Sequence, residues 1–171
     1  MASTSIQTVP SSSTSAFSKP QPGYDVFLSF RGEDTRYQFA DHLYHALNDK
    51  EIIAFKDDKE LKKGEPISQE LLDAIENSRI AVIILSKNYA SSTWCLEELA
   101  KIIECRERGI LTVVPIFYHV EPTDVRHQTN TFKGAFAKHE KRFGENPIKV
   151  QKWRAALTNV ADLIGQCLKD G

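Results

Sequence analysis

The segment Tyr-Asp-Val-Phe-Leu-Ser-Phe-Arg-Gly-Glu-Asp at residues 24–34 decides the fold of this chain. Its first seven residues are mostly aromatic or aliphatic, which is typical of a strand buried in a parallel sheet. The run stops at Arg31 and Gly32, and acidic residues typical of a helix start follow. Ligands of open α/β sheets bind at the carboxyl ends of the strands. This charged loop therefore predicts a site for an anionic or phosphate-bearing ligand.

Strand-like and helix-like segments alternate along the rest of the chain. The predicted strands cover residues 24–30, 52–55, 80–86 and 111–118, and the predicted helices cover residues 35–49, 67–77, 93–106, 132–143 and 149–164. We expect an irregular segment at residues 122–130 and an edge strand at Cys167 and Leu168.

This alternation requires right-handed crossovers and a parallel sheet covered by helices on both faces. The apolar run at residues 80–86 is typical of the central strand. We therefore predict the α/β class, with a flavodoxin-like three-layer fold and a five-stranded parallel sheet of order 2-1-3-4-5. This order places the topological switch point between the first and third strands, where the loops at residues 31–36 and 87–93 converge.

Composition and charge restrict the class of function. The chain has 171 residues, of which 41% are hydrophobic, and this is enough for one domain with a sizeable core. The 22 Lys and Arg residues against 23 Asp and Glu residues give a formal net charge of −1. Bulk charge therefore does not favour nucleic acid or an anionic membrane as a partner. Cys95, Cys105 and Cys167 lack metal-ligand spacing and suit a reducing cytosol.

Residues 1–22 differ in composition from the domain at residues 23–171. They are rich in serine, threonine and proline, and they carry one cation and no acid. They contain no apolar run long enough for a signal peptide or a membrane span, so we predict a disordered tail. The absence of arginine argues against an organelle transit peptide.

A second polar segment, at residues 86–99, begins the helix that follows the central strand. Glu97 and Glu98 lie near the start of this helix, where acids usually complement the helix dipole. Neighbouring helical residues point about 100° apart, so one glutamate can serve the dipole while the other lines the crevice. Trp94 is either a stacking surface or, more commonly for a tryptophan at a helix start, a core anchor.

Six segments of the chain, in the same order, resemble the TIR (Toll/interleukin receptor homology) domains of plant immune receptors. They are YDVFLSFRGEDTR at residues 24–36, DDKEL at 57–61, SKNY at 86–89, WCLEEL at 94–99, VPIFY at 114–118 and WRAAL at 153–157. The resemblance implies that the chain is either part of a nucleotide-binding leucine-rich-repeat receptor or a TIR-only protein. It also implies that the protein acts in the cytoplasm or nucleus. It also implies self-association with other TIR domains and cleavage of NAD⁺ or NADP⁺, as substrate and without a cofactor, at the nicotinamide–ribose bond to signal cell death.

The resemblance implies roles for particular residues, and it assigns the catalytic carboxylate to Glu98. The residues that would bind the substrate, mostly in the loop after the first strand, are Phe30, Arg31, Gly32, Glu33, Asp34, Thr35, Arg36, Gly64 and Trp94. Among them, Arg31 and the backbone amides after Gly32 would hold the phosphates. The loop at residues 56–66 would close over the ligand or dock on a neighbouring subunit. The alternative is that the lysines of this loop are only solvated charges, which is the more common case for such runs.

One carboxylate is enough for this reaction. Glycoside cleavage ordinarily needs a second carboxyl group that protonates the departing oxygen, but nicotinamide leaves as a neutral base. A single ionised carboxylate can then stabilise the oxocarbenium-like charge. We expect the helix dipole to keep Glu98 ionised.

The resemblance implies that three positions take part in self-association. In the resembled family a serine–histidine pair on the first helix mediates it, and here Asp41 replaces the serine beside His42. Gly165 is followed by glutamine where the family has tryptophan, and the chain stops soon afterwards. We therefore expect the final helix of the family to be missing, and we take Asp41, His42 and Gly165 as candidate self-association residues.

Alternatives remain for other residues and for the function. Cys95 aligns with a family cysteine linked to a cyclic-nucleotide synthetase activity, and a plain buried thiol is an equal alternative. His42 and His45 lie three apart on a helix, but no third ligand accompanies them, so we expect no metal site. The rival to an enzyme is a non-enzymatic adaptor that recruits other TIR domains.

Overall fold

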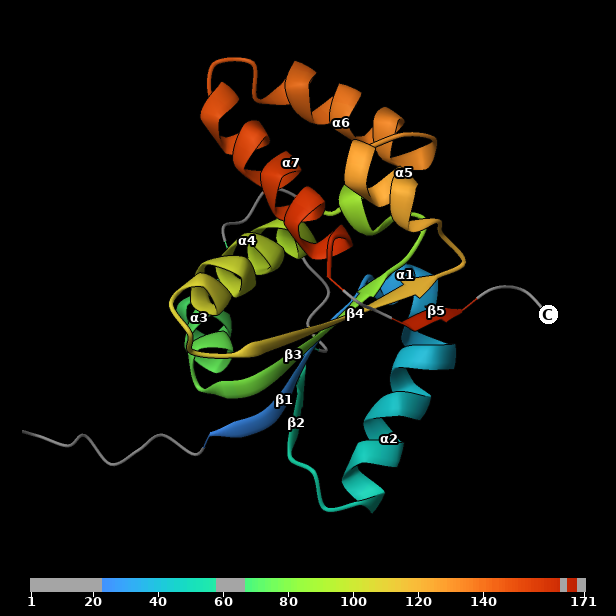
Figure 1. Cartoon of the computed structure of the whole chain (residues 1–171), viewed down its shortest axis with the longest axis vertical. Helices are drawn as coiled ribbons and strands as arrows, with labels where there is room; N and C mark the ends of the chain where they lie inside the picture. Colours follow the sequence, from blue (N-terminus) through green and yellow to red (C-terminus); the bar gives the residue numbers. More distant parts are fainter. Residues whose placement is uncertain (1–22, 58–66, 164–165, 169–171) are drawn as a thin grey trace, which may run out of the picture.

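The computed structural model describes residues 23–57, 67–163 and 166–168 (Figure 1). The strands are β1 (Tyr24–Ser29), β2 (Ala54–Lys56), β3 (Ser78–Leu85), β4 (Thr112–Tyr118) and β5 (Gln166–Leu168). The helices are α1 (Gly32–Thr35), α2 (Asp41–Asp49), α3 (Gln69–Glu76), α4 (Thr93–Glu107), α5 (Pro122–His127), α6 (Thr131–Arg142) and α7 (Pro147–Ala161), with a π-helical turn η1 (Arg36–Ala40) and a 3₁₀ turn η2 (Tyr89–Ser91).

The strands form a parallel sheet of order β2-β1-β3-β4-β5, which matches the predicted order. β3 lies in its centre, as the apolar run at residues 80–86 predicted. The predicted edge strand is also found, because β5 pairs with β4 and places Cys167 opposite Phe117. The prediction of a missing final helix concerns the chain after β5, which lies outside the described residues.

Helices cover both faces of the sheet, which confirms the three-layer α/β fold. α3, α4 and α7 lie on one face and α2 lies on the other (Figure 1). The larger core cluster packs under the three helices and includes Phe27, Ile83 and Trp153. The smaller cluster packs under α2 and includes Leu28 and Ile84. Neighbouring residues of β1 and of β3 are therefore buried on opposite faces, which explains their continuous apolar sequences.

The segment over the second face is more complex than the single helix predicted at residues 35–49. It begins at Gly32 and passes through the π-helical turn before α2 starts. Phe39, Leu43 and Leu47 pack together against the smaller cluster, as predicted, although no residue of α2 is fully buried. Apolar spacing reveals this shared face, but it does not reveal a π turn, which inserts one extra residue into the helix.

The prediction of an irregular segment at residues 122–130 is wrong, because α5 lies there. Pro122 begins this helix at a position where a missing N–H group has no cost. Val125 is fully buried, and Gln128 ends the helix in a left-handed conformation with φ 52°. The helix has six residues and one buried side chain, too few to produce a helical period in the sequence.

Serine caps set where two helices begin. Ser68 Oγ accepts a hydrogen bond from the backbone N–H of Leu71 and begins α3, and Ser92 Oγ accepts one from the N–H of Cys95 and begins α4. At the other end of the domain, α7 ends at Ala161, earlier than the predicted end at residue 164.

Candidate active site

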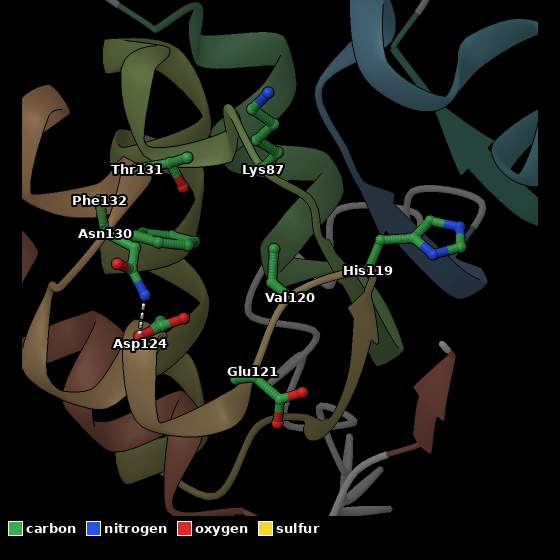
Figure 2. Close-up of a pocket in the computed structure, with 8 residues that line it drawn as sticks. All are labelled: Lys87, His119, Val120, Glu121, Asp124, Asn130, Thr131 and Phe132. Atoms are coloured by element: carbon green, nitrogen blue, oxygen red, sulfur yellow. Dashed lines mark hydrogen bonds between the residues drawn. The ribbon is translucent and has the colours of Figure 1, made fainter. Parts of the chain in front are cut away.

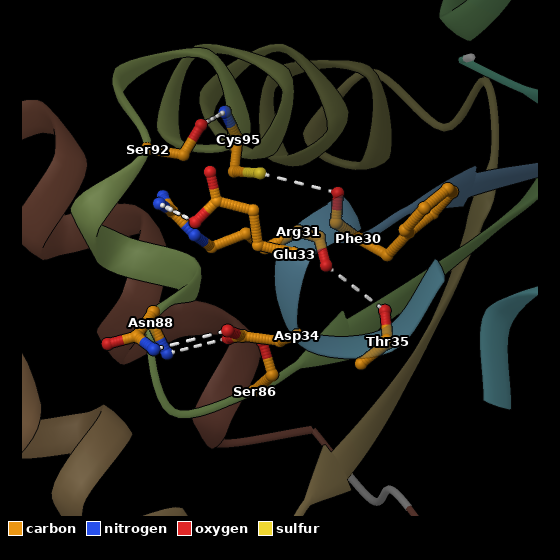
Figure 3. A network of polar contacts seen from close by, with 9 residues as sticks. All are labelled: Phe30, Arg31, Glu33, Asp34, Thr35, Ser86, Asn88, Ser92 and Cys95. Carbon is orange, nitrogen blue, oxygen red and sulfur yellow. Dashed lines mark hydrogen bonds and ion pairs between the residues drawn. The ribbon is translucent and has the colours of Figure 1, made fainter. Parts of the chain in front are cut away.

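Asp34 joins the two loops that leave the carboxyl ends of β1 and β3. Its carboxylate accepts hydrogen bonds from the Ser86 hydroxyl at 2.6 Å, the Asn88 backbone N–H at 2.9 Å and the Asn88 side-chain amide at 3.1 Å (Figure 3). Hydrogen bonds to an ionised acceptor are stronger than neutral ones. The predicted convergence of the loops at the switch point is therefore confirmed, and Asp34 is one of the residues that hold it together.

Arg31 lies directly beyond the end of β1. Its guanidinium Nη2 donates to the Glu33 carboxylate at 3.1 Å, and its backbone carbonyl accepts from the Thr35 hydroxyl at 3.2 Å. The Glu33 side chain is 83% exposed, so this ion pair is weak and exchangeable. Arg31 Nε is buried and lacks a hydrogen-bond partner. The guanidinium therefore retains capacity for an anion, which favours its predicted contact with a phosphate.

Glu98 is buried within α4, with only 3% of its surface exposed. Its carboxyl oxygen Oε2 has no hydrogen-bond partner. Burial is the largest influence on this carboxyl group and raises its pKa well above the usual value; hydrogen bonding with Ser29 opposes this effect, and the negative charge of Asp57 adds to it. A buried and incompletely partnered carboxyl group is typical of a functional site.

The expectation that the helix dipole keeps Glu98 ionised is wrong. α4 begins at Thr93, and its first turn contains no acidic residue, so Glu98 lies beyond the turn in which the dipole acts strongly. Desolvation therefore dominates. The pKa of the Glu98 carboxyl group is therefore raised in the folded domain.

Glu97 and Glu98 point in different directions, as the helical geometry predicted. Glu97 is half-buried, and its carboxylate pairs with Lys149 Nζ at 3.2 Å, which connects α4 to α7. Only Glu98 has an unpartnered buried oxygen. The two adjacent acids therefore differ in chemistry, and Glu97 serves as a natural comparison for Glu98.

Trp94 and Cys95 belong to the larger core cluster. Trp94 is 9% exposed, which favours the alternative of a core anchor. The Cys95 thiol donates to the Phe30 carbonyl at 3.5 Å, and burial raises its pKa (Figure 3). A thiol of this kind is a poor nucleophile at neutral pH, which favours the alternative of a plain buried thiol. Phe30 packs its own side chain into the smaller cluster.

Three buried polar atoms of the described residues lack a hydrogen-bond partner. Within residues 23–57, 67–163 and 166–168, the buried side-chain nitrogen and oxygen atoms without a hydrogen-bond partner are Arg31 Nε, Trp94 Nε1 and Glu98 Oε2. All three belong to residues that the sequence placed in the site. Folded proteins leave few such atoms, and a ligand is one of the ordinary reasons for them.

Several predicted residues cannot be placed. Gly64, Gly165 and most of the loop at residues 56–66 lie outside the described residues, and the side chain of Arg36 is not described. Gly32 begins α1 beside Arg31. On α2, Asp41 pairs with Lys56 at 2.7 Å, whereas the neighbouring His42 is exposed.

A pocket of about 360 Å³ lies at the carboxyl ends of β3 and β4, and sequence reasoning missed it (Figure 2). Its lining residues come from the loops after these strands and from α5 and α6: Lys87, His119, Val120, Glu121, Asp124, Asn130, Thr131 and Phe132. None of the predicted substrate-binding residues lines it. The segment at residues 122–130 carried no sequence signal for a helix, so nothing indicated that it would form a wall here.

The strand order and the polar switch point define a flavodoxin-like α/β domain. A sequence profile of the TIR domain matches residues 23–171. The chain belongs to the TIR domain family.

Its relatives are plant disease resistance proteins. It is 52% identical over 153 residues to the TMV resistance protein N of Nicotiana glutinosa, a match that covers 90% of this chain and 13% of that protein. It is 52% identical over 170 residues to the disease resistance protein RPV1 of Vitis rotundifolia, covering 99% of this chain and 12% of that protein. The chain thus spans only a small part of the curated relatives it matches.

A solved structure of TIR domains has the same fold as this chain. The TIR domains in the activated Roq1 resistosome, which directly recognises the pathogen effector XopQ, superpose with a TM-score of 0.78 and 56% identity. The superposition covers 84% of this chain and 87% of that chain.

The described part of the chain contains no helix long and apolar enough to cross a membrane. Across the same residues, His, Cys, Asp and Glu side chains form no group of three or more suited to a metal ion.

Proposed function

We propose that this chain is an immune-signalling TIR domain that hydrolyses NAD⁺ or NADP⁺ at the nicotinamide–ribose bond when it assembles with other TIR domains in the cytoplasm or nucleus. The observation that supports this most directly is Glu98, a buried carboxyl group with one unpartnered oxygen beside the switch point. Its relatives are disease resistance proteins, and the Roq1 match comes from an activated assembly, which supports the immune role and the TIR–TIR contacts.

The chemistry needs one carboxylate in a dry site. Nicotinamide departs as a neutral base, and positive charge develops on the ribose as the bond breaks. A carboxylate already stripped of water interacts more strongly with that charge than a solvated one does. The same burial opposes ionisation of Glu98 before the substrate arrives. The cationic nicotinamide ring and the developing ribose charge would favour the ionised form, so the Glu98 proton would pass to solvent when the substrate binds. Water would then add to the ribose cation as nicotinamide leaves, and the proton that this water loses would return to the carboxylate.

Arg31 would orient the substrate through its phosphates. Its guanidinium exchanges the weak pair with Glu33 for a phosphate, which the planar fork can hold by two hydrogen bonds. The phosphates take no part in the bond that breaks, so contacts to them contribute to binding in the ground state and the transition state alike.

The Arg31→Ala variant is therefore expected to raise the KM for NAD⁺ about tenfold and to change kcat little, because it loses uniform binding energy. Steady-state nicotinamide release gives both constants. Arg79→Ala, which removes an exposed cation at the amino end of β3, is the matched control and should leave both constants unchanged. Unchanged kinetics in Arg31→Ala with lost self-association on sedimentation would refute this placement of the phosphates.

The test of the proposed function is nicotinamide release by the purified chain across a wide range of protein concentration. We expect the rate per molecule to climb with concentration, because the active form would be an assembly of TIR domains. A rate per molecule that stays constant would indicate a self-sufficient monomer. No release even in concentrated or crowded samples would favour the adaptor.

The non-enzymatic adaptor is the second candidate function. It is favoured by α2, which has no fully buried residue and presents His42 to the surface. Self-association in the absence of nicotinamide release would support this alternative.

A further inference from the structure

Tyr89 is a fully buried tyrosine whose hydroxyl group contacts both β1 and α4. The hydroxyl oxygen is 2.8 Å from Ser29 Oγ, at the last residue of β1, and it donates a hydrogen bond of 3.1 Å to the backbone carbonyl of Cys95 in α4. Burial raises the pKa of this hydroxyl group, so it keeps the proton that it donates. Tyr89 itself belongs to η2, the turn that leads into α4. One side chain therefore joins three elements around the switch point.

A second contact connects the same strand and helix. The Cys95 thiol donates to the carbonyl of Phe30, the residue directly after β1, at 3.5 Å (Figure 3). A thiol is a weak donor, so the hydroxyl group of Tyr89 supplies the stronger of the two connections. Ser29 is fully buried and Cys95 is buried, so both connections lie in the core. We call Ser29, Phe30, Tyr89 and Cys95 the β1–α4 joint.

The β1–α4 joint lies next to the two residues that the proposed reaction uses. Arg31 directly follows Phe30, and Glu98 follows Cys95 by three residues, which is nearly one turn of α4. Side chains three residues apart lie on the same side of a helix. The distance between the guanidinium and the carboxyl group therefore depends on how β1 is held against α4. The hydrogen bonds of Asp34 connect the loops after β1 and β3, whereas the joint connects β1 to the helix itself.

We propose that Tyr89 is a positioning residue that fixes the end of β1 against the first turn of α4 and so holds Arg31 and Glu98 at the separation that the substrate requires. Loss of its hydroxyl group would leave both side chains on their own elements but would let those elements shift. A shift of about 1 Å can slow a reaction about 100-fold, because the reacting groups are no longer aligned. The kinetic consequence rests on the proposed function, whereas the connection of β1 to α4 does not.

The Tyr89→Phe variant keeps the buried ring and removes only the hydroxyl group. We expect its kcat for nicotinamide release to fall at least about tenfold and its KM to change less than about twofold, because Arg31 still binds the phosphates while the alignment of the reacting groups is lost. Ser78→Ala is the matched control. The buried Ser78 hydroxyl also donates to a backbone carbonyl, that of Ala74 at 2.6 Å, but it lies at the amino end of β3. At a temperature where circular dichroism shows both variants folded, Ser78→Ala should keep the kcat of the parent chain.

Thiol labelling of the full chain tests the β1–α4 joint without NAD⁺. Iodoacetamide labels cysteines as the folded chain opens locally, and mass spectrometry of the peptides gives the rate at each cysteine. Cys95 and Cys105 are free, buried thiols of the same helix, and Cys95 alone of the two belongs to the joint. Tyr89→Phe should raise the labelling rate of Cys95 about tenfold and that of Cys105 less than about twofold. Ser29→Ala cuts the same connection at its β1 end and should give the same selective increase, so it replaces Tyr89→Phe if that variant does not fold.

The two measurements separate this proposal from the proposed function. Unchanged labelling of Cys95, or equal increases at Cys95 and Cys105, would overturn the proposal, because Tyr89 would then have no local effect on the joint. Selective labelling of Cys95 in a chain that releases no nicotinamide would support the connection of β1 to α4 and refute the proposed function. Turnover by Tyr89→Phe with the kcat of the parent chain would refute the positioning role and leave the proposed function standing.

Discussion

The Glu98→Gln variant is expected to release nicotinamide from NAD⁺ at least about 100-fold more slowly than the parent chain. Glutamine keeps the size and the burial of the side chain but cannot carry the negative charge that stabilises the ribose cation. Glu97→Gln should retain nearly full activity, because the Glu97 carboxylate pairs with Lys149 and has no buried oxygen without a hydrogen-bond partner. Chromatography of NAD⁺ digests at equal protein concentration measures both variants.

The stability of the two variants checks that the chemistry, and not the fold, has been changed. The pKa of Glu98 is raised in the folded domain, so its contribution to stability is present at low pH and is lost as the pH rises above the unfolded value of 4.5. Glutamine does not titrate. Glu98→Gln should therefore unfold at a higher temperature than the parent chain at neutral pH. Equal activity losses in both glutamine variants, with circular dichroism unchanged, would remove the reason for assigning catalysis to Glu98.

The Asp34→Ala variant is expected to lower the free energy of unfolding by about 2–4 kcal/mol. It removes a carboxylate that accepts three hydrogen bonds from Ser86 and Asn88, and it leaves those donors without their partner at the carboxyl end of the sheet. The two loops would then separate, so nicotinamide release should fall as well. Urea denaturation monitored by circular dichroism measures the loss of stability.

Two variants serve as comparisons for Asp34→Ala. Asp34→Asn keeps one acceptor oxygen and should lose less stability. Glu33→Ala removes an acid from the same turn whose side chain is 83% exposed, and it should change the free energy of unfolding by less than about 1 kcal/mol. If Asp34→Ala were no more destabilised than Glu33→Ala, the hydrogen bonds of Asp34 would not be what joins the loops.

Much of the fold could be predicted from sequence because it depends on neighbouring residues. The apolar runs at residues 24–30 and 80–86 correspond to β1 and β3, and the strand order follows from their alternation with helices. That order also predicts that the loops containing Asp34 and Asn88 lie side by side, and the hydrogen bond between these two residues confirms it. The motifs were specific enough to identify the TIR family, which the profile match confirms.

Other features depend on side chains that are distant along the chain. The pairing of Glu97 with Lys149 and the hydrogen bond between Ser29 and Tyr89 both join segments far apart in sequence, so no local pattern contains them. α5 is too short to produce a period, and the pocket beside it therefore had no signal.

The state of Glu98 shows this division most clearly. That a glutamate follows Trp94 and Cys95 on a helix at the switch point could be predicted from the sequence, because helical spacing and the order of the strands are encoded locally. That this glutamate is buried, that one of its oxygens lacks a partner and that its pKa is raised depend on the packing of distant segments. Desolvation is a property of everything packed around a group, including β1, η2 and the residue after β2, and it outweighs the helix dipole that the local sequence suggested.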